Sequence, residues 1–295
     1  MTTTVIIAIG LSRNKIYQVK GNMMTKLTVI VDNKAGQEIK GEWGLSILIE
    51  HNDKKILLDA GGSDLFAENL QKLGFDIKDI DYAVLSHAHY DHANGMPRFF
   101  EDNKKAKFYL RETTAENCYA LDYLIFRRYI GIPKNVIRDY GDRIEFVSGD
   151  YKLCDGVYLI PHKSPCLDLI GKKEKMYTKV GGRLRPDNFS HEQSLVIETE
   201  KGLVILNSCS HGGAVNIINE IKSTFPDKHI YGLIGGFHLY NKSKKEVEEV
   251  AKNISETGIE YICTGHCTMG KAYGIMKEEL GDKLEQLHVG LIKEF

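Results

Sequence analysis

The stretch "LSHAHYDHANG", residues 85–95, places three histidines and one aspartate in the six positions from His87 to His92. The whole chain of 295 residues contains only 11 histidines. The segment 81–87, "DYAVLSH", predicts a buried strand that runs directly into this cluster. A single histidine beside a turn is ordinarily a surface residue, but four metal-binding side chains packed at the end of a buried strand indicate a metal site.

The spacing within this cluster predicts two ions. Alternate side chains of an extended segment lie on the same side, so His87 and His89 can bind one ion together. Asp91 and His92 follow where the chain is expected to turn into a helix, and they can bind a second ion a few ångströms away. Paired ions of this kind polarise a substrate and lower the pKa of a bound water.

Further ligands are expected from the second half of the chain, where predicted strands end in a small residue and a histidine. The segments "NSCSH", "IGGFH" and "CTGH" end at His211, His238 and His266. Strand ends at one edge of a sheet share a rim, which makes His211 and His266 the leading candidates. His238 follows two glycines, and it either contacts substrate and transfers a proton or is a hydrogen-bonded rim residue.

Composition limits the classes of partner. The chain is 42% hydrophobic and 27% charged, with a formal net charge of −1, which argues against electrostatic binding to nucleic acid or to a membrane surface. No apolar run reaches the roughly 18–20 residues that a membrane span needs. The opening segment lacks the features of a signal peptide, and the six cysteines form no CxxC pair, so we expect reduced thiols and a cytoplasmic protein.

Hydrophobic periodicity predicts alternating strands and helices in one domain spanning residues 1–295. Residues 1–23 are expected to be an N-terminal extension, and residues 113–190 a helical or loop insertion near the active site. Within that insertion we predict a helix over 113–131 and a mobile basic loop over 171–186. The end of the chain, 284–295, predicts a single terminal strand.

Several motifs resemble known proteins. "SHAHYDH" at 86–92 and "LLDAGG" at 57–62 resemble the signature of the metallo-β-lactamase superfamily. "GLVILNSCSHGG", "IGGFHL" and "TGHCT" are similar to the branch related to the methanopterin-pathway dihydropterin–ribofuranosylaminobenzene phosphate synthases. The resemblance extends from about Lys26 to the C-terminus. It implies an α/β fold, the αββα sandwich, with a dinuclear site along one edge.

The resemblance also implies roles for individual residues. His87 and His89 should hold one ion, and Asp91, His92 and His266 the other. Asp91 is also expected to take part in catalysis, and Asp59 to orient a ligand from beside the ions. The implied cofactor is two divalent ions, zinc first, with iron, manganese or magnesium as alternatives.

The chain departs from the superfamily pattern at one position. Hydrolytic members usually place a bridging aspartate at the end of the strand that is "VILNSCSH" here, and this departure leaves the metal count open. We assign His211 as a ligand. His191 competes with it, because it precedes a strand as the third superfamily histidine often does, although this branch typically has an acidic residue about there.

Substrate contacts are predicted at three places. In the basic segment 171–185, Arg183 and Arg185 can grip a phosphate, unless this segment is only a solvated loop. Glu42 and the sole tryptophan, Trp43, precede a strand, at a position that faces the pocket in the resembled family, and Trp43 can stack on a flat ring or pack in the core. Cys267 is a soft ligand, a pocket wall or a packed thiol.

These observations favour an enzyme with two metal ions that acts on a small phosphorylated or pterin-like molecule. The reaction is either hydrolysis or the pyrophosphate-displacing condensation of the resembled branch, so the enzyme is a hydrolase or a synthase-like transferase. An iron redox protein and a non-catalytic metal-binding sensor are the alternatives. We expect a small-molecule partner, neither nucleic acid nor membrane, and leave a homo-oligomer open.

Overall fold

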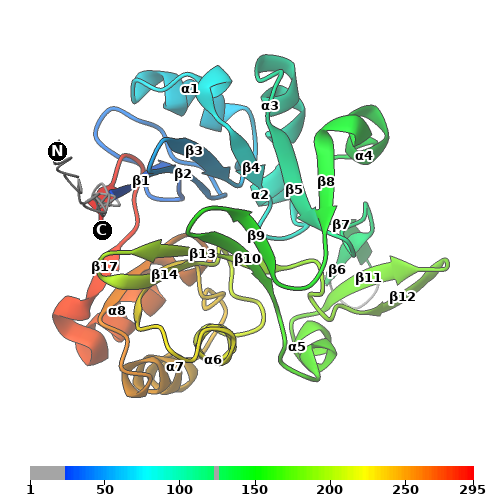
Figure 1. Cartoon of the computed structure of the whole chain (residues 1–295). Helices are drawn as coiled ribbons and strands as arrows, with labels where there is room; N and C mark the ends of the chain where they lie inside the picture. The colour runs from blue at the N-terminus through cyan, green and yellow to red at the C-terminus, as the bar shows by residue number, and fades with distance from the viewer. Residues whose placement is uncertain (1–23, 123–125) are drawn as a thin grey trace, which may run out of the picture.

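A computed structural model describes residues 24–122 and 126–295 of the chain. Two seven-stranded sheets lie face to face between outer layers of helices (Figure 1). The first sheet contains, in spatial order, β18 (Ile292–Glu294), β1 (Thr25–Val31), β2 (Ser46–His51), β3 (Lys54–Leu58), β4 (Tyr82–Val84), β5 (Lys107–Arg111) and β8 (Ile144–Val147). The second contains β17 (Leu284–Gln286), β16 (Tyr261–Thr264), β15 (Ile230–Gly235), β14 (Gly202–Leu206), β13 (Gln193–Thr199), β10 (Val157–Pro161) and β9 (Tyr151–Cys154).

Helices cover the outer faces of both sheets. The first sheet is covered by α1 (Leu65–Lys72) and α3 (Met96–Asp102), with α4 (Val136–Asp139) beyond β8 and the short α2 (Tyr90–Ala93) behind β4 (Figure 1). The second is covered by α6 (Ala214–Thr224), α7 (Lys244–Glu256) and α8 (Met269–Leu280). A smaller sheet of β12 (Arg183–Pro186), β11 (Met176–Val180), β6 (Cys118–Asp122) and β7 (Phe126–Tyr129) lies beside them, next to α5 (Leu167–Lys173).

Strand residues alternate between two hydrophobic cores. Ile47 and Ile49 of β2 pack with Leu195 and Val204 of the second sheet, which closes the core between the sheets. Leu48, between them in sequence, packs on the other side with the residues of α1 and α3. This period of two is what a strand buried on both faces requires. The predicted αββα sandwich is confirmed.

Parallel pairing brings several strand ends to one edge. β3, β4, β5 and β8 run parallel in the first sheet, and β14, β15, β16 and β17 run parallel in the second. Asp59 follows the end of β3, the segment 85–92 follows β4, and His211, His238 and His266 follow β14, β15 and β16. The topology therefore gathers polar segments that are distant in sequence.

The helix predicted over 113–131 is wrong. Its described residues form the antiparallel pair β6 and β7, in which Tyr119 lies opposite Tyr129. Strand β6 also pairs with β11, where Tyr177 lies opposite Tyr119. A segment rich in aromatic residues, with apolar residues at mixed spacing, suits either a helix or a strand. Here the distant strand β11 supplies the backbone hydrogen bonds that hold β6 in a sheet.

Two further predictions need correction. The segment 171–186 is not a loop, because its main part is the β11–β12 hairpin, which turns at Gly181 and Gly182 with φ of 56° and 79°. The terminal segment is two strands, since the chain turns at Gly290 (φ 82°) and passes from β17 in the second sheet to β18 in the first.

The expected N-terminal extension, residues 1–23, lies outside the described residues. The assignment of a single domain stays a prediction. Among residues 24–122 and 126–295, no helix combines the length and the apolar character of a membrane span.

Candidate metal centre

The first group of ligand atoms comes from His87, His89 and His211. The three side chains are buried, and their ligand nitrogens all lie within 4.8 Å of one another. Within the described part of the chain, Nε2 of His87, Nε2 of His89 and both ring nitrogens of His211 have no hydrogen-bond partner. A buried polar atom without a partner is costly, so this convergence indicates a place for a cation.

These three imidazoles are in the protonation state that binds metal. Burial, followed by the neighbouring imidazoles His92 and His238 respectively, holds the pKa of His87 and of His211 well below the usual range. Burial and His191 lower the pKa of His89 to about 3. All three rings are therefore neutral at neutral pH, with a lone pair free for coordination.

The second group comes from Asp91, His92 and His266. Nε2 of His266 lies 3.4 Å from Oδ2 of Asp91 and 3.2 Å from Nε2 of His92. Nδ1 of His92 lies 2.8 Å from Oδ2 of Asp59, and Nδ1 of His266 lies 3.1 Å from Oδ1 of Asn33. Because these acceptors bind the Nδ1 atoms, the Nε2 atoms of the two rings face each other and the carboxylate of Asp91.

A buried carboxylate with two imidazole nitrogens this close to it requires a positive charge among them. Burial lowers the pKa of His266, but the negative charges of the Cys267 thiolate and the Asp91 carboxylate raise it to about 9. Although burial raises the pKa of Asp91, His92 and His266 bring it below its usual range. A proton shared by this group is therefore what a divalent cation would displace.

Asp59 fixes the orientation of histidines in both groups. Its Oδ1 accepts the backbone N–H of Ser86 at 2.7 Å, and its Oδ2 accepts the Oγ of Ser86 at 2.7 Å and of Ser208 at 2.5 Å. Because Ser86 Oγ donates to Asp59, it accepts from Nδ1 of His87 at 2.8 Å. The carboxylate thus sets the tautomer of His92 directly and that of His87 through Ser86, as outer partners of metal ligands do.

Backbone strain is concentrated at the strand ends that form the centre. Asp59, Ser210, His238 and His266 have positive φ values of 62°, 53°, 49° and 45°. Each such conformation in a residue other than glycine costs of the order of 1 kcal/mol, and it persists where the surrounding structure holds it for a purpose.

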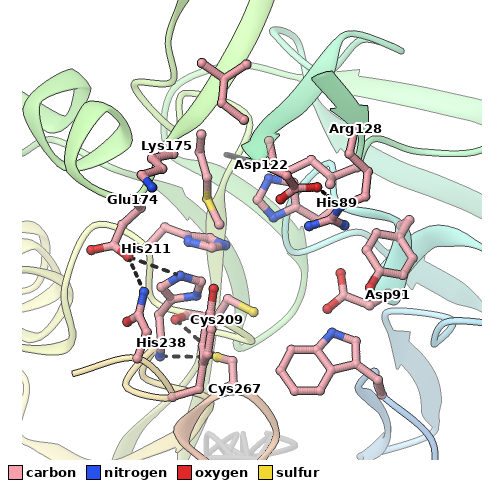
Figure 2. Close-up of a pocket in the computed structure, with 18 of the residues that line it drawn as sticks. His89, Asp91, Asp122, Arg128, Glu174, Lys175, Cys209, His211, His238 and Cys267 are labelled. Atoms are coloured by element: carbon pink, nitrogen blue, oxygen red, sulfur yellow. Dashed lines mark hydrogen bonds and ion pairs between the residues drawn. The ribbon is translucent and has the colours of Figure 1, made fainter. Parts of the chain in front are cut away.

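A pocket of about 790 Å³ opens over both groups. His89, Asp91 and Arg128 line one side of it, and Lys175, Glu174, His211 and His238 line the opposite side (Figure 2). Trp43 and Tyr240 form an aromatic side, with ring centroids 6.1 Å apart. The pocket has the volume of a small-molecule site.

Comparisons with known proteins agree with this geometry. The family model described as the metallo-beta-lactamase superfamily matches residues 44–170. The crystal structure of a metal-dependent hydrolase of the β-lactamase superfamily is 30% identical, with a TM-score of 0.78 over 92% of this chain and 99% of that chain. The chain belongs to the metallo-β-lactamase superfamily. Members of this superfamily depend on divalent metal ions, and the two groups of converging ligand atoms fit such ions.

Two other proteins are similar to this chain. The 7,8-dihydropterin-6-methyl-4-(β-D-ribofuranosyl)-aminobenzene-5′-phosphate synthase of Methanocaldococcus jannaschii is 29% identical over 92% of this chain and 96% of its own length. The zinc-bound PqqB of Methylobacterium extorquens shares the fold alone, with a TM-score of 0.56 at 9% identity over 92% of this chain and 100% of that chain.

His191 lies beside the centre, but the protein already uses its nitrogens. Nδ1 accepts the backbone N–H of Ala88 at 3.2 Å, and Nε2 lies 3.1 Å from Oδ2 of Asp187. Although burial lowers its pKa, the Asp187 carboxylate raises it well above the ordinary value. His211, in contrast, is grouped with His87 and His89, and within the described residues its ring nitrogens have no hydrogen-bond partner.

The remaining predicted residues divide into those that line the pocket and those that do not. Trp43, 41% exposed, lines it and lies over the ring of His266, with centroids 5.2 Å apart. His238 lines it beside His211, with ring centroids 4.4 Å apart. The Cys267 thiol is a buried part of its wall and accepts the backbone N–H of His238 at 3.2 Å.

Three predicted substrate contacts lie elsewhere. Glu42 accepts backbone N–H groups of Gly62 and Ser63 and lines a different hollow. Arg183 is exposed on the hairpin, and Arg185 lines a hollow on another side. Both arginines lie on β12, whereas the basic residues of this segment that line the pocket are Lys173, at the end of α5, and Lys175, just before β11.

Sequence reasoning also missed side chains that support the centre. Asp32 accepts the backbone N–H of His266 at 2.9 Å, while Asn33 holds its ring. The available signal was "VDN" at 31–33, two polar residues directly after a buried strand. Arg128 could not be found, because it belongs to β7, in a small sheet whose pairing the sequence does not reveal.

Proposed function

We propose that this chain is a metal-dependent enzyme with a dinuclear centre that acts on a small phosphorylated or pterin-like substrate. The observation that carries the proposal is the pair of buried ligand groups at the floor of one pocket. One ion would be held by His87, His89 and His211, and the other by Asp91, His92 and His266. Zinc is the expected ion, because nitrogen-rich ligand sets suit it.

Bound ions would supply a water of lowered pKa and stabilise negative charge on a reacting oxygen. The chain's own residues then have defined tasks. Asp59 keeps the imidazoles of His87 and His92 aimed into the centre. His238 stands at the pocket wall, with Nε2 3.9 Å from Oε2 of Glu174, where it can hold or pass a proton.

The walls of the pocket support the substrate class. Lys175 and Arg128 are cations that can bind a phosphate, with Asp122 placed 2.8 Å from Nε of Arg128 to steady it. Trp43 and Tyr240 offer faces and edges to a flat ring. The similar synthase carries both a dihydropterin and a 5′-phosphate in its name, which joins these two features in one molecule.

A reducing compartment such as the cytoplasm is part of the proposal. It is supported by the six cysteines, which are free thiols in the structure.

The test is a substrate panel on metal-loaded protein of measured metal content. It compares phosphodiester, thioester and lactone hydrolysis with pyrophosphate release from a pterin diphosphate and a ribofuranosylaminobenzene phosphate. We expect activity on one phosphorylated substrate, and loss of that activity in Asp91→Ala. Wild-type protein that carries about two ions per chain and turns over none of these would overturn the proposal.

Lys175→Gln tests the phosphate contact, with Lys172→Gln as the matched control from the same basic segment. Lys172 is exposed and does not line the pocket. We expect Lys175→Gln to raise the KM for the phosphorylated substrate about tenfold, corresponding to one charge-assisted hydrogen bond, while Lys172→Gln leaves it unchanged. Equal KM values in both variants would remove Lys175 from the substrate site.

A further inference from the structure

Glu174 lies in the turn between α5 and β11, between two lysines that line the pocket, Lys173 and Lys175. We propose that Glu174 is a positioning residue that holds this turn against the loop after β15, and thereby fixes Lys175 where it binds a phosphate group of the substrate. This inference rests on the proposed function and adds a residue that acts through the phosphate-binding lysine.

The carboxylate of Glu174 is held by side chains of the loop after β15. Its Oε2 accepts the Nδ2–H of Asn241 at 2.9 Å, and its Oε1 pairs with Nζ of Lys242. The side chain of Glu174 is only 4% exposed, although it lines the pocket on the same side as Lys175 and His238 (Figure 2). Because a carboxylate this deeply buried needs donors in place of water, these contacts fix the position of the turn.

A second ion pair from the same turn is much weaker. Nζ of Lys173 lies 3.0 Å from Oε1 of Glu246 on α7, but the two side chains are 67% and 41% exposed. Exposed pairs contribute little, because water screens the charges and both side chains lose freedom. Of the two pairs, the one at Glu174 is therefore the contact that can hold the turn.

The backbone of Lys175 is held in a strained conformation. Its φ of 56° lies in the left-handed region, which residues other than glycine rarely adopt. Its N–H donates to the carbonyl of Lys172 at 3.3 Å, and its carbonyl accepts the N–H of Leu121 at 3.0 Å. Such strain persists only where the surrounding structure enforces it. The side chain of Lys175 therefore starts from a fixed place at the pocket wall.

Lys175 is also a pocket cation whose charge is available to a ligand. Nε of Arg128 lies 2.8 Å from Oδ2 of Asp122, and Lys173 is paired with Glu246. Within residues 24–122 and 126–295, Nζ of Lys175 has no carboxylate partner. An ammonium group binds phosphate oxygens as a point charge, so its contribution depends on where the backbone places it.

A direct electrostatic effect of Glu174 would have the opposite sign. A carboxylate beside a phosphate site repels the phosphate, so its removal by itself should strengthen binding, and it would also leave Lys242 without its partner. A positioning role predicts weaker binding, because the turn that carries Lys175 is no longer held. The direction of the change in phosphate affinity separates the two.

The experiment is calorimetric titration of the metal-loaded, full-length protein with inorganic phosphate. We expect Glu174→Ala to weaken phosphate binding by up to about tenfold, the contribution of one charge-assisted hydrogen bond from Lys175. Lys175→Gln should weaken it at least as much. The double variant should bind phosphate as Lys175→Gln does, because both changes remove the same interaction.

Glu198→Ala is the matched control. Its carboxylate also holds a lysine, Lys228, and accepts the hydroxyl of Tyr158 at 2.9 Å, but it does not line the pocket. We expect this variant to bind phosphate as the wild type does. A loss as large as that of Glu174→Ala would show that any broken ion pair weakens the site, and it would overturn the specific role of Glu174.

Lys242→Met removes the same contact from its other end, which keeps the test valid if Glu174→Ala does not fold. Lys242 does not line the pocket, so we expect weaker phosphate binding that again does not add to the loss in Lys175→Gln. A metal-loaded wild type that binds no phosphate would overturn the phosphate site of the proposed function. Where the wild type binds phosphate, unchanged or tighter binding in Glu174→Ala, or losses that add to that of Lys175→Gln, would overturn the role of Glu174 alone.

Discussion

His211 and His191 are two buried histidines beside the ring of His89, and they differ in whether the protein supplies hydrogen-bond partners for their nitrogens. Their ring centroids lie 4.8 Å and 5.5 Å from that of His89. Within the described chain neither ring nitrogen of His211 has a hydrogen-bond partner, whereas His191 bonds Ala88 with one nitrogen and Asp187 with the other. Burial and neighbouring imidazoles lower the pKa of His211, and Asp187 overcomes burial to raise that of His191.

The difference teaches how a metal ligand can be told from a structural histidine. Burial and proximity do not distinguish the two residues, because both are nearly inaccessible. The distinction lies in whether the protein supplies the compensating partner. A buried imidazole without a hydrogen-bond partner, next to other imidazoles in the same state, is stable only when a cation takes the partner's place.

The largest expected effect comes from exchanging the two histidines for alanine. His211→Ala should lower the metal content from about two ions per chain toward one and abolish turnover, because one ligand group is left with two nitrogens. His191→Ala should retain the metal, because its nitrogens serve other partners. Metal analysis after dialysis measures both, and a His191→Ala protein that loses an ion would reverse the comparison.

Asp59→Asn should have the next largest effect. It keeps the shape but replaces one carboxylate oxygen by a donor, so the orientation of His87 and His92 is no longer enforced. We expect metal affinity to fall about 10- to 100-fold. The control is Asp64→Asn, an exposed residue at the start of α1, which should bind metal as the wild type does. Equal affinities in the two variants would deny Asp59 its positioning role.

Asp187→Asn tests whether His191 has a structural role. It replaces the carboxylate oxygen that accepts the Nε2–H of buried His191 by a neutral amide, and loss of a hydrogen bond to a charged group costs about 1.5–3 kcal/mol of unfolding free energy. Denaturant titration measures the loss, and metal analysis should find the ion content unchanged. Loss of metal at unchanged stability is the result that contradicts a structural role.

The smallest effect is a pH dependence at His162, a partnered histidine behind the centre. Its Nε2 lies 3.3 Å from Glu192, its Nδ1 lies 3.1 Å from Glu220, and the two carboxylates overcome burial to raise its pKa to about 10. Because the folded pKa exceeds the unfolded value of about 6.5, the stabilisation is complete below about pH 6.5 and is lost as the pH rises through 10.

Denaturant titration of the metal-free protein at several pH values measures this effect. The unfolding free energies of wild type and His162→Gln should differ most at the acidic end and converge as the pH approaches that folded pKa. A difference that stays constant with pH would mean that His162 is not charged in the folded protein.

The sequence by itself determined the part of the centre that is local. His87 to His92 lie together because they adjoin in the chain, and alternation along an extended segment is a property of the backbone. The buried strands were also visible in the hydrophobic pattern, because a strand covered on both faces needs apolar residues throughout. The histidines that follow β14, β15 and β16 could therefore be placed at strand ends.

Only the tertiary structure decided which histidines keep their lone pairs and which residues form the pocket wall. Asp187 neutralises His191, Asp59 orients His87 through Ser86, and β6 pairs with β11 to carry Lys175 to the rim. These contacts join segments that are far apart in the chain or depend on an unpredicted turn. Hydrogen bonding and electrostatics act over a few ångströms in space, and spacing along the chain does not encode such distances.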